Sequence, residues 1–200
     1  MPGSQAPHSL VVGSDGQHRC GWVGADTEYQ RYHDEEWGVP KRDDRVLFEK
    51  LCLEGFQAGL SWITILRKRD NFRTAFHRFD PERVAVLTQD DVERLMGDTG
   101  IVRNRLKINA TISNAQAWLA IMAERPGGFS SLVWETVHGE TIVNRPKTMA
   151  DVPSKTPAAE ELCKRLKTAG FRFVGPTICY AFMQSMGLVD DHLEGCWKAC

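Results

Sequence analysis

Apolar side chains recur at intervals of three and four residues through most of the chain from Cys20 onward. This spacing places them on one face of an α-helix, and no segment shows the strict alternation that is typical of a half-buried strand. The sequence also contains no internal repeat and no low-complexity segment. The pattern therefore predicts an all-α fold.

Capping residues and helix breakers divide this pattern into separate helices. Asp26 and Ser61 stand where N-caps are expected, and Pro157 and Gly170 follow the usual order of proline inside a helix start and glycine past its end. The predicted helices span residues 27–37, 43–58, 62–76, 81–87, 89–96, 103–125, 129–137, 156–170 and 176–186, and one extended stretch is predicted at residues 141–144.

Length and composition indicate one folded domain. The chain has 200 residues, of which 42% are hydrophobic and 26% charged, so disorder as the main state is excluded. Residues 1–18 are rich in proline, glycine and serine and are predicted to form a flexible tail, which leaves residues 19–200 as the domain. With no apolar run of membrane length and no leader pattern, we expect a cytoplasmic protein without a membrane partner.

The charge balance limits how the chain could bind nucleic acid. A formal net charge of −1 excludes a protein that coats nucleic acid by charge alone. A local site is still open, because Gly97 and Gly100 lie between two predicted helices and Arg103 follows them. Backbone N–H groups in such a turn can bind a phosphate at a helix start. An ordinary loop with a solvated basic face explains the same residues equally well.

Glu54 is a candidate site residue because of its position on a predicted helix. Leu47, Leu51 and Ala58 fall on the same helical stripe, so the carboxylate lies among apolar residues. Such a carboxylate stands either at the edge of the core or in a cleft that receives a cationic ligand.

Aromatic side chains supply a second group of candidates. Tyr29, Tyr32 and Trp37 share one face of the first predicted helix, and Trp62 follows Glu54 across a glycine-rich junction that contains Gly59. Aromatic rings stack on bases and attract cations, although such a stripe is more often part of a core.

Cysteine and histidine residues predict a metal site. Cys20 and His33 lie near the start of the chain, and His192 and Cys196 are four residues apart, so one short helix could present both. Two cysteines and two histidines suit a closed tetrahedral zinc site that ties the chain ends together. His18 and Cys200 are competing ligands, and the remaining cysteines, Cys52, Cys163 and Cys179, lie in apolar runs and are predicted to be buried thiols.

Several stretches resemble the 3-methyladenine DNA glycosylase I family of bacteria. The resemblance covers residues 19–196 and includes Asp191, His192 and Cys196; its longer stretches are CGWV at 20–23, YHDEEWG at 32–38, LEGFQAGLSW at 53–62, GIVR at 100–103 and FRFVGPTICY at 171–180. It implies a helix-hairpin-helix fold with a lobe of residues 55–125 and a zinc-stapled lobe of residues 19–54 and 126–200. It also implies a monomeric enzyme that excises 3-methyladenine from double-stranded DNA by base flipping.

The resemblance assigns a role to each candidate residue. One structural zinc ion would be held by Cys20, His33, His192 and Cys196. The base pocket would contain Glu54, Tyr29, Tyr32, Trp37 and Trp62. Gly59 and Leu60 would fill the gap left by the flipped nucleotide, and Gly97, Gly100 and Arg103 would contact phosphates. Asp190 departs from the family pattern, in which asparagine is expected.

Two other functions fit parts of the pattern. A zinc-stapled binding module without activity would have no need for Glu54 facing a stacking ring. A zinc hydrolase would need an open coordination position, which four ligands do not leave.

Related helix-hairpin-helix glycosylases activate water with an aspartate after the hairpin, whereas residues 103–123 contain no acidic residue. Whether Glu54 activates water or only binds the base stays open at this stage.

Overall fold

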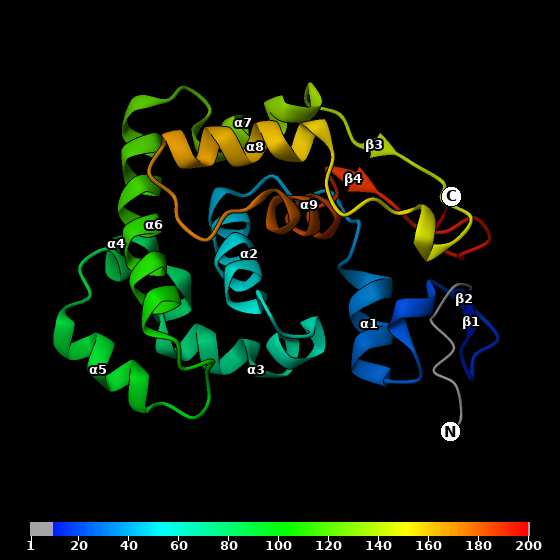
Figure 1. Ribbon diagram of the computed structural model, residues 1–200, viewed down its shortest axis with the longest axis horizontal. Helices are drawn as coiled ribbons and strands as arrows, with labels where there is room; N and C mark the ends of the chain where they lie inside the picture. Colours follow the sequence, from blue (N-terminus) through cyan, green and yellow to red (C-terminus); the bar gives the residue numbers. More distant parts are fainter. Residues whose placement is uncertain (1–9, 200) are drawn as a thin grey trace. The chain divides into compact units, whose positions relative to one another are not determined.

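The computed structural model describes residues 10–199 and confirms that the chain is mostly helical. These residues form two compact units (Figure 1), each of which is described by itself. The first unit contains residues 10–40, 140–154 and 183–199, and the second contains residues 41–139 and 155–182. Within the described residues, no helix is both long enough and apolar enough to cross a membrane.

The second unit is built around helix α2 (Asp44–Gln57), which packs against α3, α6 and α7. All residues from Leu51 to Phe56 are buried, so this part of the helix is covered on every side rather than along one stripe. Two of the polar residues of α2, Lys50 and Glu54, are buried as well. The other helices of this unit are α3 (Trp62–Ala75), η2 (His77–Phe79), α4 (Pro81–Val84), α5 (Gln89–Gly97), α6 (Arg105–Glu124), α7 (Gly128–Trp134), η3 (Glu135–Val137), α8 (Pro157–Thr168) and α9 (Pro176–Ser185), whose last three residues belong to the first unit.

Phenylalanine rings fill the space between α2 and α3. The rings of Phe56 and Phe72 lie 4.6 Å apart between centroids, and the chain of contacts continues through Phe76 to Phe79. All four rings are buried. Because each buried ring removes a large apolar area from water, this cluster holds the two helices together.

Local capping explains where the helices begin. Asp43 caps α2, and Thr88 and Asp91 form a reciprocal capping box on α5. Helix α6 begins at Arg105, two residues later than predicted, because the side chain of Asn104 accepts a hydrogen bond from the N–H of Lys107 at 3.1 Å. Arg103 consequently lies in the loop before the helix rather than inside it.

The first unit contains helix α1 (Thr27–Glu35) and short segments around it. Strands β1 (Val11–Val12) and β2 (His18–Arg19) pair antiparallel, and β3 (Ile142–Val143) pairs parallel with β4 (Val189–Asp190). Strand β3 confirms the extended stretch predicted at residues 141–144. The remaining elements are η1 (Gly21–Val23) and η4 (Met149–Asp151).

Two local predictions for this unit are wrong. Residues 10–18 are predicted to belong to a flexible tail, but they lie in the β1–β2 hairpin. The guanidinium of Arg19 holds this hairpin in place, because it forms ion pairs with Asp15 at 2.7 Å and with Asp34 at 2.6 Å. The rest of that tail, residues 1–9, lies outside the described residues. His192 and Cys196 do not share a short helix; a turn separates them.

Candidate functional site

Three of the four predicted metal ligands come together in the first unit. The ligand atoms of Cys20, His33 and Cys196 all lie within 4.8 Å of one another, and all three residues are buried. The Nε2 atom of His33 is 3.5 Å from the Sγ atom of Cys196. Two thiols and an imidazole are donors that favour zinc and other thiophilic ions, so this group could hold a metal.

His192 lies beside this group without being part of it. Its ring centroid is 5.1 Å from that of His33, and its side chain is almost fully buried. The Nδ1 atom is 2.6 Å from Oδ1 of Asp190, whereas the buried Nε2 atom has no hydrogen-bond partner among the described residues. A buried nitrogen in this state is a suitable fourth donor, because its lone pair is otherwise unsatisfied. Cys200, the competing ligand considered above, lies outside the described residues.

Carboxylates orient both histidine rings. Nδ1 of His33 is 2.8 Å from Asp34, in the same relationship as His192 and Asp190. Burial raises the pKa of Asp190, but hydrogen bonds from His192 outweigh this effect and lower the pKa to about 2. Asp190, where the family pattern has asparagine, is therefore a competent partner for the His192 ring.

Hydrogen bonding and burial shift the pKa values of the two cysteines in opposite directions. The Cys20 thiol donates to Cys196, and together with His33 it lowers the pKa of Cys196 to about 4. The pKa of Cys20 is raised by the same hydrogen bond and by burial. Metal ions bind cysteine as the thiolate, and these hydrogen bonds favour that form at Cys196.

The predicted pocket aromatics of the first unit surround Trp22. The ring of Trp22 lies 4.9 Å from Tyr29 and 5.2 Å from Trp37, and Tyr32 is 6.4 Å away. Trp37 also contacts His192, whose ring lies 4.6 Å away, and stacks on His33 of the metal group at 6.1 Å. Sequence reasoning did not single out Trp22 as a site residue, although it falls in one of the stretches that carry the resemblance.

Glu54 borders a cavity of about 190 Å³ in the second unit. Its side chain is 4% exposed, which excludes a glutamate that merely reaches from the core edge to solvent. Gly59 and Leu60 line the same cavity, as do Gln57, Ala58, Thr177, Ile178 and Ala181. The structure therefore brings three of the predicted site residues around one space.

A buried lysine joins Glu54 to Trp62. The Nζ atom of Lys50 is 2.9 Å from Oε1 of Glu54 and 3.2 Å from the centroid of the Trp62 ring. Sequence reasoning did not single out Lys50. The signal was present, because Lys50 precedes Glu54 by four residues and so faces the same side of α2.

The turn between α2 and α3 presents an apolar side chain to solvent. Gly59 has a φ of +84°, a conformation that side chains other than glycine rarely adopt, and the side chain of Leu60 is 43% exposed. Lys107 on α6 holds this turn by donating to the carbonyl oxygens of Phe56 at 2.9 Å and Ala58 at 2.7 Å.

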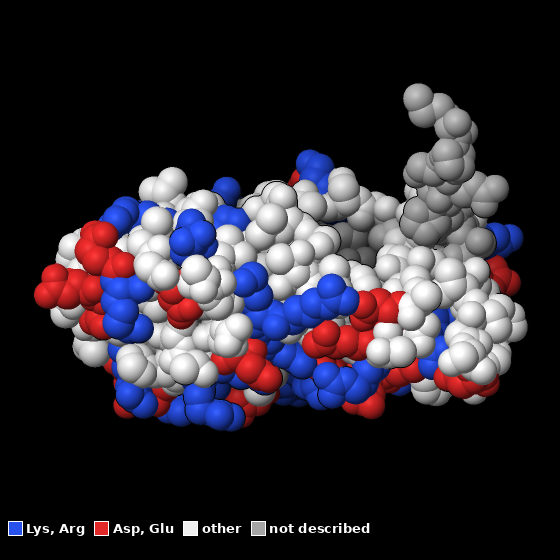
Figure 2. Space-filling model, turned by 90° about the horizontal axis from the view of Figure 1, so that it is seen from below, with Lys and Arg blue, Asp and Glu red and all other residues white. Residues whose placement is uncertain are grey.

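The predicted phosphate-binding hairpin lies between α5 and α6. Gly97 is the last residue of α5, and the N–H of Gly100 donates to Oδ1 of Asp98 at 2.7 Å. Arg103 is exposed in the loop. Figure 2 shows basic and acidic side chains interspersed on the face that it draws.

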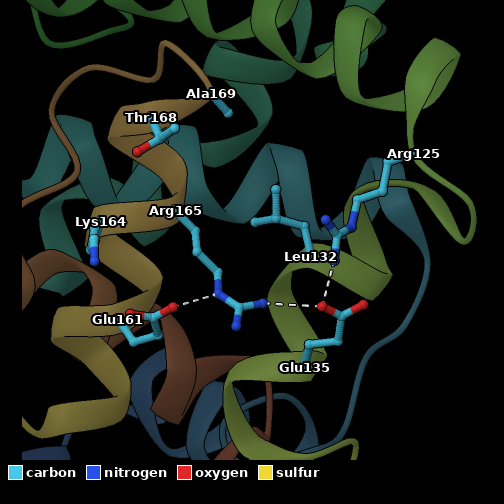
Figure 3. A pocket seen from close by; sticks show the side chains of 8 residues that line it. All are labelled: Arg125, Leu132, Glu135, Glu161, Lys164, Arg165, Thr168 and Ala169. Atoms are coloured by element: carbon cyan, nitrogen blue, oxygen red, sulfur yellow. Dashed lines mark hydrogen bonds and ion pairs between the residues drawn. The ribbon is translucent and has the colours of Figure 1, made fainter.

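A larger cavity of about 510 Å³ lies away from these residues, between α6, α7 and α8 (Figure 3). Arg165 joins Glu161 at 2.8 Å to Glu135 at 3.1 Å, and Arg125 also pairs with Glu135. These charges compensate one another across the cavity. The ion pairs therefore link the end of α6, η3 and α8.

Comparison with known proteins adds family information to this geometry. A family model described as methyladenine glycosylase matches residues 22–199. DNA-3-methyladenine glycosylase 1 of Escherichia coli (strain K12) is 53% identical over 178 residues, which are 89% of this chain and 95% of that protein. A DNA-3-methyladenine glycosylase of Haemophilus influenzae (strain ATCC 51907 / DSM 11121 / KW20 / Rd) is 51% identical over 89% of this chain and 96% of its own length.

Solved structures show the same likeness. A crystal structure of 3-methyladenine DNA glycosylase I matches with a TM-score of 0.88 and 53% identity, over 91% of this chain and all of the other. A structure that describes 3-methyladenine recognition by the Staphylococcus aureus enzyme matches with a TM-score of 0.87 and 38% identity, over 91% of this chain and 96% of the other.

Proposed function

The chain belongs to the methyladenine glycosylase family, and from that premise we propose that it hydrolyses the N-glycosidic bond of 3-methyladenine in alkylated double-stranded DNA. The observation that carries this proposal is the buried carboxylate of Glu54, which borders a cavity next to the exposed Leu60. A flipped base needs a pocket with a hydrogen-bond acceptor, and the duplex needs a side chain to fill the gap.

The reaction follows from the charge of the damaged base. Methylation at N3 makes the base a cation within the nucleotide. When the glycosidic bond breaks, its electron pair goes to the base, which leaves as a neutral purine and needs no proton from the protein. The remaining tasks are to extrude the nucleotide, to hold the base, and to stabilise positive charge on the sugar while water adds.

Glu54 and Trp62 are the groups that we propose hold the base. The carboxylate accepts hydrogen bonds from the edge of the purine, and the indole ring stacks on its face, where the cation is attracted by the ring electrons. Tyr29, Tyr32 and Trp37 are further aromatic contacts, as the resemblance implies.

DNA contacts are proposed at two turns. Leu60, positioned by Gly59, enters the space that the flipped nucleotide leaves, since an exposed apolar side chain gains contacts there. Gly97, Gly100 and Arg103 contact phosphate in a helix-hairpin-helix arrangement. The carboxylate of Asp98 accepts from the Gly100 N–H in the free protein, so this contact requires Asp98 to turn away.

We propose one structural zinc ion held by Cys20, His33, His192 and Cys196. The unpartnered Nε2 atom of His192 supports this set, as does the gathering of the other three ligand atoms within 4.8 Å of one another. Four protein ligands leave no coordination position for water, so the ion supplies fold stability rather than chemistry. The protein is proposed to act as a monomer in the cytoplasm, where its substrate DNA lies.

Replacement of Glu54 by glutamine tests the proposed role of the carboxylate. Glu54→Gln keeps the size of the side chain but removes its charge, so we expect single-turnover excision of 3-methyladenine to slow by at least about tenfold. Binding of the free base should weaken in parallel. Glu124→Gln, an exposed carboxylate on α6, is the matched control. An excision rate unchanged by Glu54→Gln would exclude the role.

A further inference from the structure

Lys50 is one of two buried lysines among the described residues of the second unit. Its side chain is 8% exposed, although lysine is among the residues that are most rarely buried. Burial of an ammonium group is costly unless strong partners compensate for the lost water. Lys50 has two such partners, the carboxylate of Glu54 at 2.9 Å and the ring of Trp62 with its centroid at 3.2 Å.

These two partners are the groups proposed above to receive the base. A cationic purine would offer its edge to the carboxylate and its charged face to the indole ring. The ammonium of Lys50 makes both kinds of contact at once. At 3.2 Å from the ring centroid, it leaves no room for a stacked base on the same face of Trp62.

We propose that Lys50 is a built-in substitute for the cationic base, which occupies Glu54 and Trp62 while the pocket is empty and withdraws when 3-methyladenine enters. This inference rests on the proposed function, since it takes Glu54 and Trp62 to be the base-binding groups. The cavity of about 190 Å³ at Glu54 gives the base an approach to the carboxylate. The four-carbon stem of lysine lets the ammonium move without a change in α2.

The charges of the reaction give this exchange a direction. Before cleavage, one cation replaces another, so Glu54 stays compensated. Cleavage turns the bound base into a neutral purine, which has a weaker hold on the carboxylate and the ring. Lys50 keeps its charge and then competes for both groups, and it therefore promotes release of the product. In the empty pocket the same ion pair keeps Glu54 from being a buried, uncompensated charge.

The position of Lys50 can be followed directly in the wild-type protein. The ε-CH₂ group of Lys50 is bonded to the Nζ atom that lies over the Trp62 ring, so the ring current should move the NMR signal of its protons strongly upfield. We expect this signal in protein labelled with ¹³C-lysine, assigned by its loss in Lys50→Met. Saturation with 3-methyladenine should return it to the ordinary lysine position. A bound base with the upfield signal intact would overturn the proposal.

Product inhibition supplies the second measurement. In Lys50→Met the competing ammonium is absent, so we expect the inhibition constant of free 3-methyladenine to fall by about tenfold. The inhibition constants of the wild type and Lys50→Met are compared at a pH at which Glu54 is ionised in both proteins. The carboxyl ¹³C shift of Glu54 identifies that pH range. Lys164→Met, an exposed lysine on α8, is the matched control and should leave the constant unchanged. An unchanged or higher constant in Lys50→Met would contradict a competing role.

Failure of this inference and failure of the proposed function are distinguishable. If 3-methyladenine binds and is excised while Lys50 stays on Trp62, only the exchange is wrong. If the base causes no NMR change anywhere in the second unit and no base is released from alkylated DNA, the proposed function fails and this inference fails with it. If Lys50→Met does not fold, the upfield signal is assigned by its loss in Lys50→Arg, which keeps the charge, and the wild-type titration still decides.

Discussion

The ammonium of Lys107 lies 2.7 Å from the carbonyl oxygen of Ala58, across 49 residues of sequence. It also donates to the carbonyl oxygen of Phe56, so one side chain satisfies two groups at the end of α2. Burial lowers the pKa of this lysine. The contact fixes the turn that carries Gly59 and Leu60, and it links α6 to the candidate site.

Removal of this ammonium should weaken both the fold and the turn. Lys107→Met leaves two carbonyl oxygens without their donor, so we expect the free energy of unfolding to fall by about 2 kcal/mol. Excision should slow as well, because Leu60 is no longer held in position. Urea denaturation and single-turnover excision measure the two effects. Wild-type stability in Lys107→Met would show that the hydrogen bonds contribute nothing.

Leu60 should matter for activity and hardly at all for stability. Its side chain is 43% exposed, so Leu60→Ala should change the free energy of unfolding by less than about 0.5 kcal/mol. Excision should slow by about tenfold, because the gap in the duplex is no longer filled. Val86→Ala, at another exposed apolar position, serves as the control. If both variants excise at the wild-type rate, Leu60 does not fill the gap.

Metal removal should change the reactivity of two cysteines. With one zinc ion bound, Cys20 and Cys196 should be protected from thiol reagents, and chelation should expose them. Cys52, Cys163 and Cys179 are buried, and burial raises the pKa of Cys52 and Cys179, so these three should stay slow to react in the folded protein. The measurement uses Cys200→Ser to remove the remaining thiol. Equal reactivity with and without chelator would contradict the zinc site.

Cobalt substitution separates a structural metal from a catalytic one. Co²⁺ accepts the same cysteine and histidine donors in tetrahedral geometry, so the substituted protein should keep its fold and excise at close to the wild-type rate. The thiolate-to-cobalt absorption band reports that the ion is bound. Loss of excision in a folded, cobalt-loaded protein would show that the ion takes part in the reaction.

Acid should release the ion pair that spans the predicted hairpin. Hydrogen bonds lower the pKa of Glu93 to about 2: the larger effect comes from Arg105, at 2.7 Å, and the smaller one from Gln89. Because the folded pKa lies below the ordinary value near 4.5, this pair stabilises the fold above that value and is lost as pH falls toward 2. Carboxyl NMR should give the low midpoint, and Arg105→Met should raise it. A midpoint near 4.5 in both proteins would exclude the pair in solution.

Much of the helical framework could be predicted from the sequence, because the apolar pattern and the caps are local properties. Helix α6 begins two residues after the predicted start at Arg103, because the side chain of Asn104 caps it. The β1–β2 hairpin was not anticipated, since it depends on Arg19 reaching Asp34, and a contact of this kind leaves no periodic pattern.

The candidate site was predictable in its residue types but not in its charges. Spacing placed Glu54 on an apolar stripe, and the structure buries it beside a cavity. The role of Lys50 could not be inferred, because a lysine on a helix normally extends to solvent. Its burial follows from the packing of α3, α6 and α7 around α2, which is a tertiary effect.

The most direct test of the account is the release of bases from DNA treated with a methylating agent, separated by chromatography. We predict that the protein releases 3-methyladenine well above the spontaneous background and that Glu54→Gln releases it far more slowly, whereas Glu124→Gln matches the wild type. Absence of 3-methyladenine above background with folded wild-type protein would contradict the central claim.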